Sequence, residues 1–132
     1  MCAFAHVRFL DRLPAADKAR LMPALQRVTL AVGDTLYQVG QTAQHIFFPL
    51  TAQVQEVLPM NGGHEEVLRR IGPNEMVGSC VLGNPVAART ARVSQAGEAW
   101  RMAYADFARA LEEVASFRAL VMQDALAGAS VS

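Results

Sequence analysis

Apolar and polar residues alternate in short segments along much of the chain. The first clear segment begins at Arg27 and places Val28, Leu30 and Val32 on one face, and a Gly-Asp turn separates it from segment 35–39. Alternation with a period of two is typical of a strand with one buried face, because successive side chains point to opposite sides. The pattern therefore predicts two consecutive strands joined by a tight turn.

The same alternation recurs in four further segments, each bounded by turns that contain glycine or proline. These segments are 45–58, 64–71, 89–94 and 98–103. Many short strands at regular spacing, with such turns between them, indicate an all-β sandwich or barrel. The predicted fold class is mainly β: a jelly-roll β-barrel (double-stranded β-helix) with a short N-terminal helix and C-terminal helices.

The N-terminal helix is predicted from residue 14 onward. Pro14 suits the first turn of a helix, and apolar residues follow at Leu21, Met22 and Leu25. Pro23 cannot donate a backbone hydrogen bond and should bend or end this helix.

The C-terminal part from 104 to 129 has few helix breakers and carries apolar residues at helical spacing. Two helices are expected, broken near Ala115-Ser116, with Ser116 as the N-cap of the second. The stripe of the second helix is only modestly apolar; it comprises Phe117, Leu120, Val121, Asp124 and Gly128. The pattern leaves open whether this helix packs on its own barrel or against a second copy of the chain.

Length and charge limit the classes of function. At 132 residues the chain is long enough for one domain and too short for two. We expect a helical lead-in (1–26), a barrel (27–103) and exit helices (104–129). Twelve basic residues balance twelve acidic ones, so this chain alone is not expected to bind DNA. It has neither a long apolar run nor a secretory signal pattern, and we expect a cytoplasmic protein that does not bind membranes.

Metal and catalytic motifs are not found in the sequence. Cys2 and Cys80 lack the number and spacing of a disulfide framework, a zinc site or an iron–sulfur site. The histidines, at positions 6, 45 and 64, are dispersed, and no nucleophile-elbow motif surrounds Ser79. We therefore predict no metal site and no enzymatic activity.

Residues 76–93, MVGSCVLGNPVAARTARV, carry the candidate chemistry. A glycine turn, a short helical turn, a Pro-marked loop and an Arg-Thr pair follow one another. Free amides at a helix start and a following guanidinium can converge on one phosphate-sized anion. The candidate ligand-binding residues are Gly78, Ser79, Cys80, Val81, Arg89 and Thr90. Arg89 has an alternative role, a structural ion pair with a carboxylate such as Glu75 or Glu98.

This segment resembles the phosphate-binding cassette of cyclic-nucleotide-binding domains, in particular the sensor domains of Crp/Fnr-type bacterial transcription regulators. The sequence Arg89-Thr90-Ala91-Arg92-Val93 fits the family pattern Arg-Ser/Thr/Ala-Ala-x-Val. The stretches FLDRLPAADKARL and HIFFPLTAQVQEV are also similar to the N-terminal module of these regulators. The resemblance implies that Arg89 pairs with a cyclic phosphate and that Thr90 adds a hydrogen bond.

One position departs from the family pattern. The family's cassette opens with Gly-Glu, and that Glu accepts the ribose 2′-hydroxyl, whereas here Gly78 is followed by Ser79. The resemblance implies a small anionic effector, with a cyclic nucleotide as one candidate, but the sequence does not identify it. It also implies a homodimer formed through the C-terminal helix, and DNA binding only through a C-terminal domain that this sequence lacks.

Two other functions stay open at this point. The domain could have lost its ligand site and serve only to dimerise or to dock a partner, which Ser79 in place of Glu favours. It could also sense haem through Cys2 and His6, or redox state through Cys80 near a helix N-terminus, where the thiolate is favoured.

Overall fold

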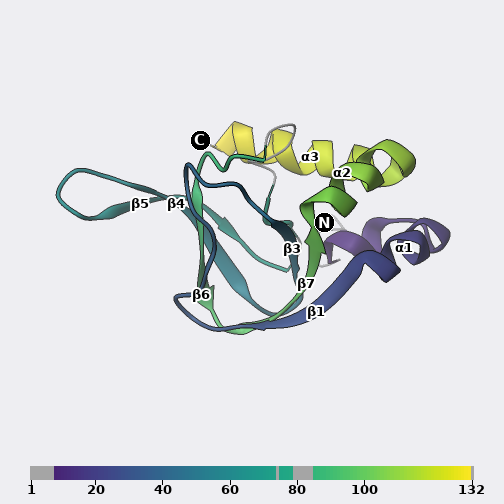
Figure 1. Cartoon of the computed structure of the whole chain (residues 1–132), viewed down its shortest axis with the longest axis horizontal. Helices are drawn as coiled ribbons and strands as arrows, with labels where there is room; N and C mark the ends of the chain where they lie inside the picture. The colour runs from purple at the N-terminus through teal and green to yellow at the C-terminus, as the bar shows by residue number, and fades with distance from the viewer. Residues whose placement is uncertain (1–7, 74, 79–84, 132) are drawn as a thin grey trace, which may run out of the picture.

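The computed structural model describes residues 8–73, 75–78 and 85–131, with only the backbone for 127–131. The strands form two antiparallel sheets (Figure 1). One sheet has the order β1 (Leu25–Leu30), β7 (Gly97–Ala103), β3 (His45–Pro49). The other has the order β2 (Thr35–Tyr37), β6 (Thr90–Gln95), β4 (Gln53–Pro59), β5 (Glu65–Ile71). The predicted jelly-roll class is confirmed, but the two sheets do not close into the expected barrel.

The predicted strand 45–58 is wrong, because it is two strands. β3 ends at Pro49 and β4 begins at Gln53, and they belong to different sheets. Proline lacks the amide hydrogen that would extend the pairing of β3. The half-buried Leu50 and the buried Ala52 continue the apolar pattern across the break, which hides it in the sequence.

The corner between β3 and β4 packs tightly against the turn into β7. The amides of Leu50 and Thr51 donate hydrogen bonds to the carbonyl of Glu98 at 2.8 and 3.1 Å. The Thr51 hydroxyl accepts a third bond from the Glu98 amide at 2.8 Å. A Cβ on Gly97 would lie 2.5 Å from the backbone nitrogen of Ala52, so only glycine allows this approach.

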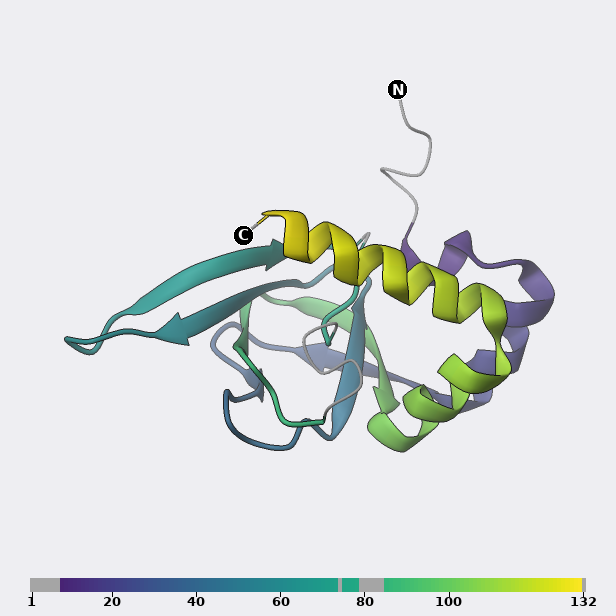
Figure 2. The ribbon, with the colours of Figure 1, turned by 90° about the horizontal axis from the view of Figure 1, so that it is seen from above.

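The helices are the 3-10 helix η2 (Phe9–Arg12), α1 (Ala15–Leu21), the 3-10 helix η3 (Met22–Ala24), α2 (Tyr104–Glu113) and α3 (Ala115–Val131). The β4–β5 hairpin projects on the side opposite α1, and the C-terminal end of α3 reaches the base of this hairpin (Figures 1 and 2). The α1 helix gives way at Leu21 to the 3-10 turn that contains Pro23, as predicted. In the part of the chain that the structure describes, no helix has the length and apolar character needed to cross a membrane.

The break between α2 and α3 falls at Val114, close to the predicted position. The prediction of Ser116 as an N-cap is wrong, because α3 already includes Ala115. The Ser116 hydroxyl instead donates a hydrogen bond to Oδ2 of Asp17 at 2.6 Å. This bond ties the start of α3 to α1.

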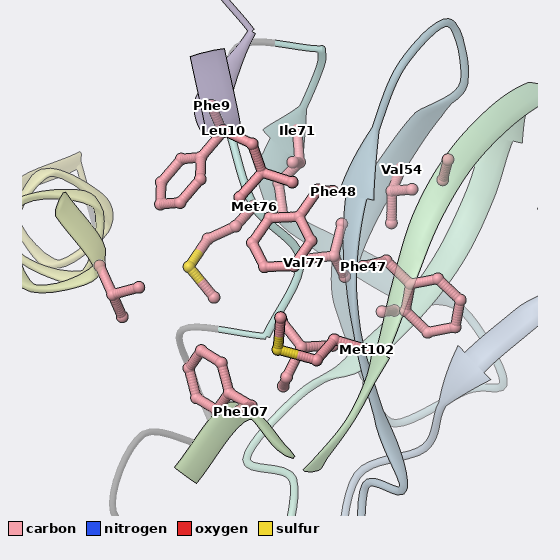
Figure 3. Packing of buried hydrophobic residues seen from close by; sticks show 14 of the residues in the cluster. Phe9, Leu10, Phe47, Phe48, Val54, Ile71, Met76, Val77, Met102 and Phe107 are labelled. Carbon is pink, nitrogen blue, oxygen red and sulfur yellow. The ribbon is translucent and has the colours of Figure 1, made fainter. Parts of the chain in front are cut away.

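An aromatic cluster joins the first sheet to the helices (Figure 3). The ring centroids of Phe9 and Phe48 are 5.5 Å apart, and those of Phe107 and Phe117 are 5.8 Å apart in an edge-to-face arrangement. The ring centroids of Phe48 and Phe117 are 6.2 Å apart, which connects the two pairs into one cluster. Tyr37, Phe47 and Phe48 are buried, while Trp100 is half-buried.

The apolar stripe of α3 packs on the domain itself. Phe117, Leu120 and Val121 are buried in the core cluster. The other face exposes 46% of Met122 and 68% of Leu126. The stripe therefore packs within the chain, which was one of the two predicted alternatives. Gly128 lies outside the side chains that the structure describes.

Candidate functional site

The segment that carries the candidate site is fixed at its start by β3. Val77 and Phe47 exchange two backbone hydrogen bonds of 2.8 and 3.0 Å. Gly78 follows with a φ of +139°, and a Cβ on it would lie 2.6 Å from Cδ1 of Ile46. The position therefore requires glycine for its backbone conformation, and a larger residue would also displace the end of the buried Ile46 side chain.

The far end of the same segment is fixed by the chain between β2 and β3. The Ala43 amide donates to the Pro85 carbonyl at 2.7 Å, and the Ala87 amide donates to the Gln41 carbonyl at 2.9 Å. Ser79, Cys80 and Val81, which were predicted to line an anion cradle, lie outside the described residues. Their role stays a prediction.

Arg89 stands just before β6 and forms an ion pair with a carboxylate of β4. Its Nη1 atom lies 3.2 Å from Oε1 of Glu56. The Arg89 side chain is 24% exposed and that of Glu56 only 1%. The predicted alternative, an ion pair with a carboxylate, is confirmed, but its partner is Glu56, because Glu75 pairs with Arg69 and Glu98 pairs with Arg27.

Glu56 belongs to a row of cross-strand partners over the second sheet. Tyr37 faces Ala91, Ala91 faces Glu56, and Glu56 faces Arg69. The small side chain of Ala91 leaves room above it, and the Tyr37 hydroxyl donates to Oε2 of Glu56 at 3.1 Å. This partner of Arg89 was not predicted from the sequence. The signal was an acid at an inward position of an apolar alternation, between Val54 and Leu58.

Thr90 is buried and holds the end of β2. Its hydroxyl oxygen accepts a hydrogen bond from the Val39 amide at 3.0 Å, which leaves its own hydrogen for a further partner. Arg92 forms an ion pair with Glu65 of β5 instead of joining Arg89. The structure therefore brings Arg89 and Thr90, at the start of β6, together with Glu56 of β4.

A second charged cluster lies at the other end of the row. Nη2 of Arg69 lies 2.8 Å from Oε2 of Glu75 and 3.3 Å from Oδ1 of Asp124. Burial raises the pKa of the Asp124 carboxyl, although Arg69 opposes this effect. Burial opposes the charge of Arg69, but Asp124 and Glu75 together raise its pKa, so it stays charged. The cluster, which the sequence did not predict, joins β5, the segment before Gly78 and α3.

The remaining candidates that the structure describes form no second site. His45 packs beside Phe47, and burial together with Arg101 lowers its pKa. Among the described residues, no three histidine, cysteine or acidic side chains gather as a metal site would require. The haem and thiol alternatives depend on Cys2, His6 and Cys80, which lie outside the described residues, and they stay predictions.

Several solved structures share this fold. The N-terminal domain of a transcriptional regulator from Streptomyces coelicolor A3(2) is 21% identical with a TM-score of 0.69, over 96% of this chain and 91% of that one. The sensor domain of the transcriptional regulator DNR from Pseudomonas aeruginosa is 15% identical with a TM-score of 0.71, over 91% and 82%. The Catabolite Activator Protein of Thermus thermophilus is 18% identical with a TM-score of 0.69, over 90% of this chain and 55% of that one.

The sequence itself also matches a family. No curated protein matches the chain by sequence at a significant level. Residues 27–114, however, match the family described as the cyclic nucleotide-binding domain, and this range contains both Glu56 and Arg89. The resemblance drawn from residues 76–93 is thereby confirmed at the level of the family. The chain belongs to the cyclic nucleotide-binding domain family.

Proposed function

We propose that this chain is the effector-sensing domain of a Crp/Fnr-type transcription regulator and that Arg89 binds a small anionic ligand. The observation that carries this proposal is the position of Arg89, which immediately precedes Thr90 at the start of β6 and remains 24% exposed. Glu56 holds one nitrogen of its guanidinium, and the planar fork has further donors for an anion. A cyclic nucleotide is a candidate effector, supported by the family match over 27–114.

The cross-strand row offers a path from the ligand to α3. A ligand that draws Arg89 away from Glu56 changes the charge balance opposite Arg69, because Glu56 and Arg69 are direct cross-strand partners. Arg69 in turn holds α3 through Asp124. Ligand binding at Arg89 and the packing of α3 are then linked equilibria, so that a change in one shifts the other.

The partners follow from the same proposal. The domain forms a homodimer through the outer face of α3, where Met122 and Leu126 are exposed. DNA is contacted by a separate domain of the regulator and not by this cytoplasmic sensor module. The module has no catalytic role, since Arg89 and Thr90 serve to bind the ligand and no nucleophile-elbow motif surrounds Ser79.

Replacing Arg89 by Ala is expected to abolish ligand-induced stabilisation. Thermal unfolding is measured with cyclic AMP, cyclic GMP and cyclic dinucleotides, and a ligand at a hundred times its dissociation constant adds about 2.7 kcal/mol. The variant should lose this increment whatever its own stability, because the guanidinium is the charge that meets the anion. Arg92→Ala is the matched control and should keep the increment, since Arg92 pairs with Glu65 instead.

A second function is favoured by the ion pair itself. Because Glu56 already neutralises Arg89, the domain can also serve as an interaction module without a ligand. This function predicts no stabilisation by any anion and a dimer whose formation depends only on protein concentration. Stabilisation that survives in Arg89→Ala would contradict the role given to Arg89.

A further inference from the structure

We propose that Glu56 is a specificity-determining residue of the effector site, which acts as the resident counter-anion of Arg89 and selects against effectors of high negative charge. This inference rests on the proposed function of Arg89. The site then prefers singly charged anions to multiply charged ones.

The first support is the environment of Glu56. Its side chain is 1% exposed, its Oε1 lies 3.2 Å from Nη1 of Arg89, and its Oε2 accepts a hydrogen bond from Tyr37. A buried carboxylate is costly unless it is paired and hydrogen-bonded, and the two contacts of Glu56 meet both requirements. An apolar residue would satisfy the alternation of β4 without this requirement.

The second support is the balance of charge along the row. Arg89 and Arg69 face the three carboxylates of Glu56, Glu75 and Asp124. An incoming anion at Arg89 therefore meets a guanidinium that is already neutralised, and it lies close to the negative charge of Glu56. Repulsion between like charges grows with the charge of the ligand and is strong in a partly buried site. Glu56 thus lowers the affinity for every anion, and most for those with the highest charge.

The test compares two probes of similar shape and different charge. Cyclic AMP carries one negative charge, and adenosine 5′-monophosphate carries nearly two at pH 8. Their dissociation constants are measured by calorimetry for the wild-type chain and for Glu56→Gln, which keeps the side-chain shape. Glu56→Gln should bind cyclic AMP at least about tenfold more tightly than the wild type does. Its gain in affinity for the 5′-monophosphate should be larger still. Glu56→Val, which restores the apolar alternation of β4, is a second neutral variant.

The controls separate charge at the site from other effects. Glu65→Gln removes the same charge from an exposed position of β5 and should change each affinity by less than about twofold. Tyr37→Phe removes the hydrogen bond to Glu56 but leaves the Glu56 carboxylate in place. This variant should not produce the gain in nucleotide affinity. The gain should disappear when Glu56→Gln is combined with Arg89→Ala.

The outcomes distinguish this inference from the proposed function. Binding that depends on Arg89 but has equal affinity and selectivity in the wild type and both Glu56 variants overturns the role of Glu56 and leaves the proposed function standing. Absence of binding in the wild type and in every neutral variant overturns both. Binding that appears only when Glu56 is neutral supports the inference.

Discussion

Replacing Arg69 by Ala is expected to lower the free energy of unfolding by about 3–5 kcal/mol, the usual effect of breaking a buried ion pair from one side. The side chains of Arg69 and Asp124 are only 6% and 8% exposed, so the variant leaves the Asp124 carboxyl buried without its partner guanidinium. Chemical denaturation followed by circular dichroism measures the loss. The Glu75 side chain is 37% exposed, so water can solvate its carboxylate in the variant. Glu75 therefore contributes little to the loss of stability.

The pH dependence of Arg69→Ala gives a second readout. Burial already raises the pKa of Asp124, and removing Arg69 removes the charge that opposes this rise. The native variant therefore holds a proton that the unfolded chain releases, and its stability falls as the pH rises above the ordinary range of an aspartate. Acidification should recover part of the loss, and so should the added change Asp124→Asn.

The matched control is Arg70→Ala on the same strand. Arg70 is exposed, and its replacement should alter the stability by no more than about 0.5 kcal/mol. An equal effect of the two substitutions would show that the cluster of Arg69, Glu75 and Asp124 contributes no more than an exposed arginine.

Replacing Phe117 by Ala is expected to cost about 3–5 kcal/mol of stability, as for other buried aromatic residues. Phe117 is fully buried and lies between Phe48 and Phe107. Because these contacts are within the chain, the loss should be the same at low and high protein concentration. Denaturation curves recorded over a roughly hundredfold range of protein concentration check this expectation.

The control for Phe117 is Met122 on the opposite face of α3. Met122 is 46% exposed, and Met122→Ala should change the stability of the monomer by less than about 1 kcal/mol. A loss in Phe117→Ala that vanishes at high protein concentration would instead place Phe117 between two copies of the chain.

Local patterns in the sequence predicted most of the strands, the helix end near Pro23 and the break before α3. They failed where the backbone turns without a change of pattern, as at 50–52, because the apolar alternation continues through Leu50 and Ala52. The corner between β3 and β4 depends on Gly97, which is distant in sequence. Its close approach to Ala52 is visible only in the fold.

The partners in the candidate site were harder to predict than its position. Arg89 was identified from its local motif, but its pairing with Glu56 depends on the register between β4 and β6. That register contains an irregularity, and β4 has another beside Glu56 in its pairing with β5. Local periodicity contains no information on either shift, and the same holds for the contact of Arg69 with α3.

The central claim is that Arg89 and Glu56 form an energetically coupled pair at the effector site. A double-mutant cycle tests it most directly, with the free energies of unfolding of the wild type, Arg89→Ala, Glu56→Gln and the double variant. We expect a coupling free energy of about 1–3 kcal/mol, because the two side chains are in contact and Glu56 is buried. Strictly additive effects of the two substitutions would contradict the claim.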